Sequence, residues 1–599
     1  MTLIPVTYQP GTIKSRQHTK ITSAAFLDTD HVRFQEDGRL ATIPAYSQTA
    51  HALLGTCRAI YAQRVTGSNS GDCFFFGTHS HLYVEKNGTT YNITPLSQTA
   101  QNLGNNPITT TDTLSVVQLT FTDIGVDNVV GDRIKLAALT DVGGITAATY
   151  LNKEQIITEI VDDDNIKFDC GFDATSSTTG GGTAPGTVKY QIAAGNESQT
   201  TASGMGAGDY GGGEYGGGGQ STTGQQAYPR IWSFGAFGDD VVMCPGDRAA
   251  GEGQYIYIWD GDTDVAPTKL TNAPTDCNWV MVVNNAIVAL CGRTVKICEP
   301  GAGTTWSGLL YYTKSLERID IAFAGFLHGD KNAIIHHGNG VVLLRYVGGA
   351  DLWDLSDLPG SPKEGVVSPY STTELNEKII WRTPSNIYEY DGGVARIVSN
   401  TQNRDWIAGN RNVSKEWHSF AYADEEREEA YFHFPVTGAS EPSDYVLLGN
   451  RSEGVFTSFT LGEMSRTAAQ RPGVFASTLY LADGDDVYRH LTRGAVTFNW
   501  YAETAFFYAQ KGEVRIFMKE FRPDSNQSGN ITLEIIGREY PQSSDVSYGT
   551  WTITSSTTVI SVKAAGRLLK LKFSGSTEAT LGEWMYDIEV LGKRQGKAA

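Results

Sequence analysis

The chain repeats a short phrase, which first reads Leu82-Tyr83-Val84-Glu85-Lys86-Asn87-Gly88. Further copies are Tyr255-Ile256-Tyr257-Ile258-Trp259-Asp260-Gly261, Ile387-Tyr388-Glu389-Tyr390-Asp391-Gly392-Gly393 and, more weakly, Val487-Tyr488-Arg489-His490. The aromatic and β-branched runs suit pleated, half-buried strands, and an Asn-Gly or Asp-Gly pair supplies the positive φ angles of a tight hairpin. A hairpin that returns at long intervals favours stacked antiparallel sheets, as in a β-propeller, whose radial repetition protects the strand edges.

Composition predicts an all-β protein with several domains. The 599 residues exceed what one hydrophobic core holds, so we expect about two to four domains. Hydrophobic residues make up 40% and charged residues 19%, and 66 glycines against 20 prolines fit many turns. No long stretch has the apolar period of an amphipathic helix. The acidic run Asp424–Glu429 is short, and we interpret it as a solvated loop or hairpin tip.

The formal net charge of −19 argues against a protein that grips nucleic acid, because Lys and Arg clusters bind the phosphate backbone. The N-terminus Met1–Pro5 lacks the basic and apolar parts of a secretory signal, and no run of about 18 apolar residues predicts a membrane span. The seven cysteines include no Cys-x-x-Cys pair. We therefore expect reduced, mostly buried thiols in a protein made in the cytoplasm.

Changes of composition divide the chain into five segments. They are an N-terminal arm with the first propeller strands (1–96), an inserted small β domain (97–200), a Gly/Tyr-rich linker (201–227), the propeller body (228–494) and a C-terminal β-sandwich-like domain (495–599). The linker composition cannot bury a core. Alternating apolar residues predict strands in the insert at Val116–Phe121, Arg133–Leu136, Gln155–Val161 and Asn165–Phe168. The same alternation predicts strands with one wet face at Val514–Lys519, Ile531–Ile536, Arg567–Phe573 and Met585–Val590.

Residues that could carry chemistry are few. His79-Ser80-His81 and His336-His337 are the close histidine pairs. Alternate strand positions would put His79 and His81 on one face, but no cysteine or carboxylate has a convincing local spacing for a metal site. We interpret Asp162-Asp163-Asp164 as an acidic hairpin turn in preference to a hard-cation site. Asp391-Gly392-Gly393 and Asp483-Gly484-Asp485-Asp486 are also predicted to be hairpin turns.

The sequence contains no familiar catalytic motif. The glycine tract lacks the Gly-Lys-Ser/Thr ending of a phosphate loop, and no Gly-x-Ser-x-Gly elbow occurs. Carboxylate pairs for glycoside cleavage stay open, since they come from distant positions, although the Ser-x-Asp-x-Gly-x-x-Trp turn of propeller sialidases is missing. We predict no catalytic, cofactor-binding or metal-binding residues, no cofactor, and a protein that is not an enzyme.

A series of phrases runs in order along most of the chain. It consists of Asp30-His31-Val32-Arg33-Phe34-Gln35-Glu36-Asp37-Gly38-Arg39-Leu40, Phe76–Val84, Tyr91–Leu96, Gly131–Ile134 with Val142–Ile145, Ile231–Asp240, Ile256–Asp260, Leu270–Pro274, and Arg567–Phe573 before Trp584. In this order the phrases resemble the tail nozzle proteins of short-tailed bacteriophages, also called tail tubular protein B or packaged-DNA stabilisation proteins. The family often has proline where this chain has Leu40 and Ala41.

The resemblance implies a β-propeller body with an inserted small β-barrel and further β domains. It implies a homo-hexameric ring in the virion tail, below the adaptor (head-to-tail connector) ring and in contact with tail fibre, spike or needle proteins. Packaged double-stranded DNA would be retained and later conducted through the channel without sequence-specific binding. Synthesis would take place in the bacterial host cytoplasm. The alternative is a virion propeller that binds or cleaves host surface glycans, which would more often be a peripheral trimer.

Two structural expectations follow. Aromatic side chains under the blades should be buried, namely Trp232, Tyr257, Trp259, Trp381 and Tyr388. Burial of Tyr83 has weaker support, because strand alternation also allows it an outward position. If the ring forms, its formal charge is 6 × −19 = −114. We therefore expect an acidic or mixed channel that does not bind DNA tightly.

Overall fold

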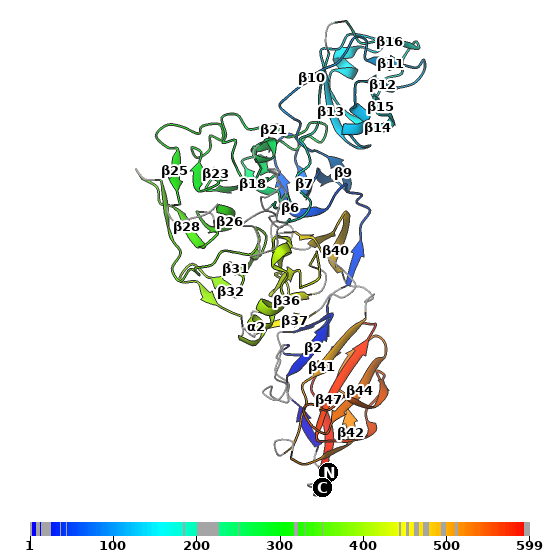
Figure 1. The fold of residues 1–599 in the computed structure, drawn as a ribbon, viewed down its shortest axis with the longest axis vertical. Coiled ribbons are helices and arrows are strands. Elements are labelled where there is room, and N and C mark those ends of the chain that lie inside the picture. Colours follow the sequence, from blue (N-terminus) through cyan, green and yellow to red (C-terminus); the bar gives the residue numbers. More distant parts are fainter. Residues whose placement is uncertain are drawn as a thin grey trace, which may run out of the picture. The chain divides into compact units, whose positions relative to one another are not determined.

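A computed structural model gives the fold, which is built mainly from antiparallel strands (Figure 1). It describes residues 3–6, 12, 25–35, 38–43, 45–183, 186–200, 227–249, 251–316, 322–329, 331–349, 352–399, 401–442, 445–450, 455–459, 466–470, 479–492, 499–509 and 513–591. The chain forms two compact units. The central unit comprises His51–Gly338 and Leu343–Ser356, and the terminal unit comprises Met1–Ala50, Asn339–Val342 and Asp357–Ala599.

The body is a β-propeller. Among the described residues, seven sheets of four antiparallel strands serve as blades. The described part of the central unit contains three whole blades. The first consists of β6 (Cys57–Val65), β7 (Gly71–Thr78), β8 (Leu82–Lys86) and β9 (Thr89–Asn92), and the second of β18 (Ser233–Phe237), β19 (Asp240–Cys244), β20 (Tyr257–Trp259) and β21 (Thr268–Lys269). The third consists of β22 (Trp279–Val283), β23 (Ala286–Cys291), β24 (Thr294–Ile297) and β25 (Tyr312–Ser315). A further blade, with residues in both units, contains β26 (Ala322–His328), β27 (Asn332–His337), β28 (Gly340–Tyr346) and β29 (Trp353–Asp357).

The terminal unit holds the remaining blades. One consists of β30 (Thr372–Leu375), β31 (Lys378–Arg382), β32 (Ile387–Tyr390) and β33 (Arg396–Ile397), and the next of β34 (Phe420–Asp424), β35 (Glu429–Phe434), β36 (Tyr445–Asn450) and β37 (Val455–Phe459). The last consists of β38 (Ala468–Ala469), β39 (Leu479–Asp483), β40 (Asp486–Thr492) and β5 (Ala45–Gln48). In the last blade, β5 pairs with β40 and brings Tyr46 opposite His490. A strand from the start of the chain therefore completes a blade built from residues beyond 468.

The first three repeated phrases all lead into loops that join antiparallel strands, as predicted, but only the first of these hairpins is tight. Asn87 and Gly88 have φ of 55° and 77° and join β8 to β9 as the predicted tight hairpin. By contrast, Asp260-Gly261 opens a longer loop before β21. A Cβ on Gly261 would stand 2.6 Å from the carbonyl oxygen of Asn69, so this glycine permits a close backbone approach. Asp391 begins a loop before β33 and accepts a hydrogen bond from the Gly393 amide.

The predicted aromatic packing is confirmed, since Trp232, Tyr257, Trp259, Trp381 and Tyr388 are all buried. Tyr83, whose burial had weaker support, belongs with them. Its side chain is buried and its hydroxyl accepts a hydrogen bond from the Leu54 amide at 3.2 Å. Three consecutive residues from Leu82 to Val84 are buried, because both faces of this blade are covered and alternation no longer marks a wet side.

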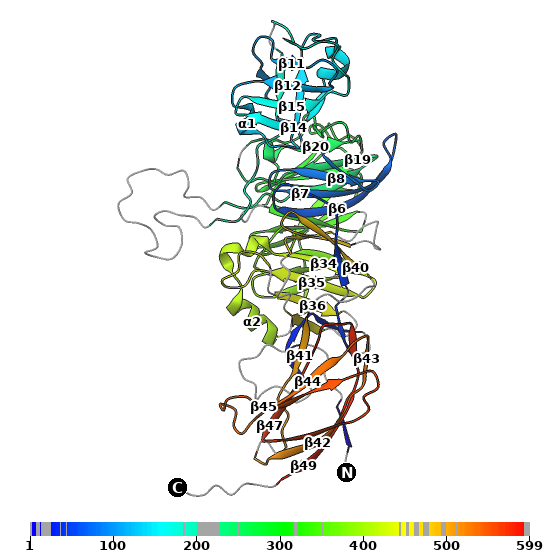
Figure 2. The same ribbon diagram turned by 90° about the vertical axis from the view of Figure 1, so that its right-hand side faces the viewer.

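The insert has its own sheet and core (Figure 2). Its strands are β10 (Gln101–Asn102), β11 (Ile108–Thr110), β12 (Val116–Thr120), β13 (Arg133–Ala137), β14 (Glu154–Asp162), β15 (Asn165–Asp169), β16 (Thr178–Gly180) and β17 (Thr187–Lys189), with a short helix, α1 (Ile124–Asp127), and a π-helix at Ala147–Leu151. The two ends of the insert meet, because Leu96 and Gln191 form a β-bridge and the Ile192 amide donates to the Pro95 carbonyl at 3.0 Å.

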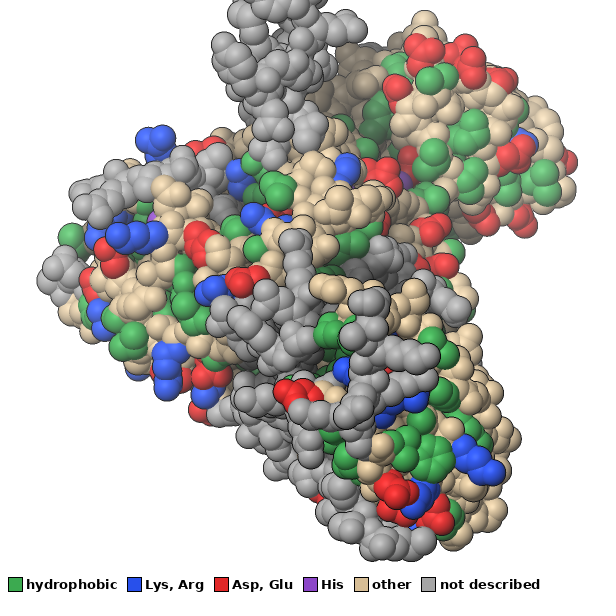
Figure 3. Space-filling view, turned by 60° about the horizontal axis from the view of Figure 1, so that its bottom comes forward, with side chains coloured by type: hydrophobic (Ala, Val, Ile, Leu, Met, Phe, Trp, Pro, Cys, Tyr) green, Lys and Arg blue, Asp and Glu red, His purple; other side chains and the backbone are tan. Residues whose placement is uncertain are grey.

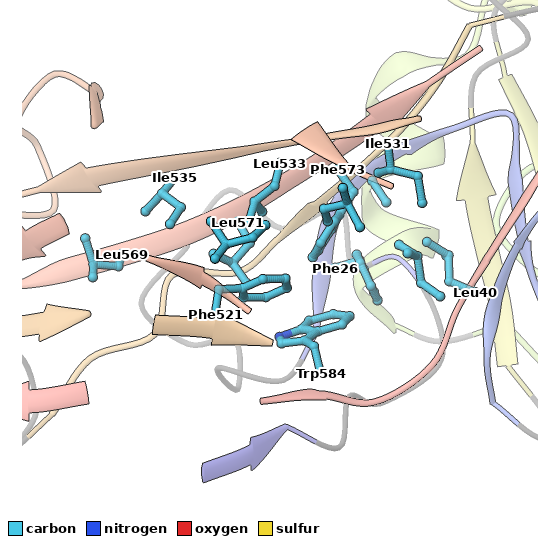
Figure 4. Packing of buried hydrophobic residues seen from close by; sticks show 14 of the residues in the cluster. Phe26, Leu40, Phe521, Ile531, Leu533, Ile535, Leu569, Leu571, Phe573 and Trp584 are labelled. Atoms are coloured by element: carbon cyan, nitrogen blue, oxygen red, sulfur yellow. The ribbon is translucent and has the colours of Figure 1, made fainter. Parts of the chain in front are cut away.

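Both ends of the chain build the β-sandwich-like domain. Its strands are β1 (Leu3–Val6), β2 (Phe26–Asp30), β3 (Val32–Phe34), β4 (Leu40–Thr42), β41 (Trp500–Thr504), β42 (Ile516–Arg522), β43 (Ser525–Gln527), β44 (Ile531–Arg538), β45 (Val546–Ile553), β46 (Ile560–Gly566), β47 (Leu568–Gly575), β48 (Ala579–Leu581) and β49 (Trp584–Val590). β1 pairs with β49 and β2 with β41. Figure 4 shows Phe26, Leu40, Phe573 and Trp584 packed in one core. The arm of segment 1–96 is thus divided between this domain and the last blade.

A helix that the sequence analysis missed is α2 (Thr401–Asn410), whose polar sequence has no apolar period. The acidic run 424–429 is a hairpin tip as predicted, but only its central residues are solvated. Asp424 is the last residue of β34 and Glu429 is the first residue of β35, and both side chains are buried. The seven cysteines are buried free thiols, as expected. Within the described ranges, no helix has the length and hydropathy to cross a membrane.

Candidate functional site

The strongest cluster of sequence-predicted residues lies where the insert joins the first blade. His79-Ser80-His81 forms the turn between β7 and β8, so the prediction that both histidines share one strand face is wrong. His79 Nδ1 accepts a hydrogen bond from the Thr56 amide at 3.1 Å, and burial lowers the pKa of this histidine. His81 is buried, and its Nε2 lies 2.7 Å from Oδ1 of Asp132 in the insert. The turn therefore directs the two rings to different partners.

Asp132 is the centre of this junction. Its Oδ1 also accepts a hydrogen bond from Gln191 Nε2 at 2.8 Å, and its Oδ2 accepts one from the Val129 amide at 2.8 Å. Gln191 in turn accepts from Asn92 Nδ2 at 2.8 Å, at the end of β9. One buried carboxylate thus links the blade, the returning connection of the insert at Gln191 and the loop before β13.

Ser80, His81 and Asp132 follow one another in the order of a hydrolytic triad, with Ser80 Oγ 2.8 Å from His81 Nδ1. The surroundings do not suit a nucleophile, which needs an open approach to its oxygen and donors for an oxyanion. Ser80 Oγ donates to the Leu54 carbonyl at 3.1 Å, and a Cβ on Gly55 would stand 2.5 Å from this oxygen. The backbone of Gly55 packs against the hydroxyl, which is already bonded to a carbonyl and to His81, and the arrangement suits a structural clamp.

Arg133 forms a second clamp beside the first. Its guanidinium donates to the carbonyl oxygens of Asn92 at 2.8 Å, Thr263 at 2.9 Å and Asp264 at 2.6 Å, and pairs with Glu154 at 3.1 Å. Glu154 also accepts from the Ala266 amide at 2.7 Å. Planar, multidentate donation of this kind suits arginine and not lysine. The insert is therefore bound to two blades, and no local pattern in the sequence pointed to these carbonyl partners.

The remaining candidates have structural surroundings. Asp162 Oδ1 caps the turn between β14 and β15 by accepting from the Asp164 amide and the Asn165 side chain, so the predicted acidic hairpin turn is confirmed. His336 is buried in β27 with its ring edge-on to Phe326 at 5.6 Å. In the part of the chain that the structure describes, no group of three or more His, Cys, Asp or Glu side chains is arranged to hold a metal ion.

Comparison with known proteins gives likeness only in solved structures. No protein-family model matches the chain, and no curated protein sequence matches it. The chain is similar to the computationally designed Ika8 protein, with 11% identity, a TM-score of 0.32 and coverage of 74% of this chain and 99% of that one. A putative gluconolactonase shows 12% sequence identity and a TM-score of 0.25, with coverage of 42% of this chain and 83% of that one. The β-propeller domain of Myceliophteria thermophila Cps50 (Swd1) shows 11% sequence identity and a TM-score of 0.24, with coverage of 43% of this chain and 99% of that domain.

Proposed function

We propose that this protein is a structural component of a bacteriophage virion, the nozzle of a short tail. Six copies form a ring below the adaptor ring, continue the DNA channel, and contact tail fibre, spike or needle proteins. The ring helps to retain the packaged genome and conducts it during ejection. Its part is mechanical, and it uses no catalytic residue or cofactor.

The observation that carries this proposal is that residues from different family-like phrases contact one another in the fold. Phe34 and Leu40 of the first phrase share one core with Phe573 and Trp584 of the last, and the rings of Phe573 and Trp584 lie 5.0 Å apart. His81, Asn92 and Asp132 come from three other phrases and belong to one hydrogen-bonded junction. Phrases that depend on one another for packing are less easily matched by chance than isolated ones.

The acidity of the chain supports the same proposal. A channel that conducts DNA must not hold it, because each phosphate neutralised by Lys or Arg adds a salt-dependent affinity. A formal charge of −19 per chain gives a repulsive field that is screened within about 8 Å at physiological salt. Such a field keeps a duplex away from the wall without binding it.

The test is the symmetry and position of the protein in a virion. Native mass spectrometry of the purified chain and a reconstruction of the phage tail should show a hexamer around a channel wide enough for duplex DNA. Heterologous contacts between unequal faces close such a ring when the rotation matches. A stable monomer or a peripheral trimer in the virion would contradict the nozzle and favour the glycan-processing alternative.

A further inference from the structure

The loop before β13, which comprises residues 121–132 and includes the short helix α1, presents apolar side chains to solvent on the insert. Val126, Val129 and Val130 are 62%, 48% and 52% exposed, and they follow one another within five residues. We call this the valine surface. Single exposed apolar residues are ordinary, but several gathered together within one loop mark a contact surface.

The valine surface is held rigidly. Ile124 is buried, and the buried Asn128 donates to its carbonyl at 2.8 Å. The Val129 amide is bound by Asp132, which is itself fixed by His81 and Gln191. The Gly131 amide donates to Ile157 in β14 at 2.9 Å. Because the backbone is ordered before any partner arrives, a partner would lose little affinity to ordering this loop.

Gly125 lets the loop pack closely against the hairpin of β14 and β15, because it has no side chain. A Cβ there would stand 2.0 Å from the Asp162 carbonyl oxygen, and the Gly125 amide donates to the Asp163 carbonyl at 2.8 Å. This contact brings the acidic turn 162–164 beside the valines, and the Asp164 side chain accepts from the Asp123 amide at 2.8 Å. The loop and the turn therefore form one surface.

The charged side chains of the loop and the turn are all acidic. Asp123 and Asp127 belong to the loop and Asp163 to the turn, and within the described residues no Lys or Arg pairs with any of them. Residues 121–132 contain no basic side chain, and Arg133, which comes next, is turned to internal partners. Figure 3 shows the insert, at the upper right, with hydrophobic and acidic side chains side by side and little blue.

We propose that the valine surface docks another protein of the tail, one whose contact face has an apolar centre and a Lys/Arg rim. Charge complementarity selects this occupant, because an apolar centre gives affinity by burial while an acidic rim excludes nucleic acid and other acidic faces. The proposal rests on the proposed function, since it places the partner in the same tail.

The test measures access to the surface in free protein and in assembled tails. All seven native cysteines are buried, so a maleimide reports on an introduced cysteine. Val130→Cys is compared with Leu114→Cys, an equally exposed position of the same insert at 49%. Both should react at similar rates in the isolated protein. In virions, Val130→Cys should react at least about tenfold more slowly than Leu114→Cys, because a docked side chain must open before it reacts.

Charge reversal provides a second readout. Asp127→Lys should lower incorporation of the partner into tails, whereas Asp112→Lys, also exposed on the insert, should not. Equal labelling of the two cysteines in virions would overturn the docking surface and leave the nozzle intact. Protection of Val130→Cys in the isolated hexamer would overturn it in favour of a second copy as the occupant. Absence of the protein from tails would overturn the nozzle as well.

Discussion

Replacing His433 by phenylalanine should stabilise the terminal unit, and more so in acid. His433 lies in β35, is buried, and stacks on Phe420 with ring centroids 4.5 Å apart and planes 10° apart. Both of its ring nitrogens are buried without a hydrogen-bond partner among the described residues. Burial, and then the charge of Arg466, hold the pKa of His433 well below its usual range. Phenylalanine keeps the stack and removes two unsatisfied polar atoms.

The magnitude follows from proton linkage. The unfolded chain binds a proton at this histidine below about pH 6.5, and the folded chain does not, so stability falls as the pH falls. Each pH unit below about 6.5 removes about 1.4 kcal/mol from the wild type and nothing from His433→Phe at this site. Relief of the unsatisfied nitrogens adds about 1–3 kcal/mol at every pH. Burial raises the pKa of the neighbouring Glu429, which acts in the opposite direction, but it is common to both proteins.

Hydrogen exchange of β34 and β35 amides in graded urea, at about pH 7 and about pH 5.5, gives the opening free energies. The advantage of His433→Phe should grow by about 1.4 kcal/mol between these conditions. His433→Ala is the control, because its cavity lowers stability at both pH values while its pH slope matches that of the phenylalanine variant. An identical slope in wild type and His433→Phe would refute the reasoning, since it would mean that the fold accepts the proton.

Four further outcomes are expected. Trp259→Ala should cost about 3–5 kcal/mol, and unchanged thermal stability would show that this indole does not support its blade. Replacing residues 97–191 by a short Gly-Ser linker should leave the rest folded and soluble, because the ends meet at Pro95 and Ile192; aggregation of the product would contradict this. Asp132→Ala should destabilise the junction by about 1–3 kcal/mol and speed proteolysis next to the insert, with Asp132→Asn intermediate. In a gel shift at physiological salt the protein should not bind duplex DNA at submicromolar concentration; tight binding that weakens steeply with salt would indicate an electrostatic clamp.

Local patterns were enough to predict the longer strands and the buried aromatic side chains. Four of the eight strands that the structure describes in the insert were predicted, and they lie within two residues of their predicted bounds, because apolar alternation records which side chains face the core. Asn87-Gly88 was identifiable for a similar reason, since its turn geometry depends on those two residues alone. Burial of Tyr83 had weaker support because alternation identifies a buried face only where the other face is wet.

Pairing between distant segments could not be predicted in this way. Tyr46 pairs with His490, and Leu3 pairs with Asp587. The sequence around these residues does not indicate either partner, because strand pairing leaves no local periodicity. The same holds for the junction. The histidine pair was found as a motif, but its carboxylate lies 51 residues further on, in another domain. Arg133 binds mainly carbonyl oxygens, which every residue has, and so gave no compositional signal.

The pairing of the first strands with the last has a consequence for synthesis. Leu3 is opposite Asp587, and β5 completes a blade whose other strands end at Thr492. At about 5–20 residues per second, a ribosome needs roughly 30–120 s to make the partner of Leu3 after Leu3 itself. During that time β1, β2 and β5 have backbone groups ready to pair, but the strands that they pair with have not been made. The first strands therefore cannot complete these sheets until residues beyond 486 and 584 have been made, and contacts of such long range slow folding. A nascent chain stalled before residue 468 should expose these N-terminal strands to chaperones.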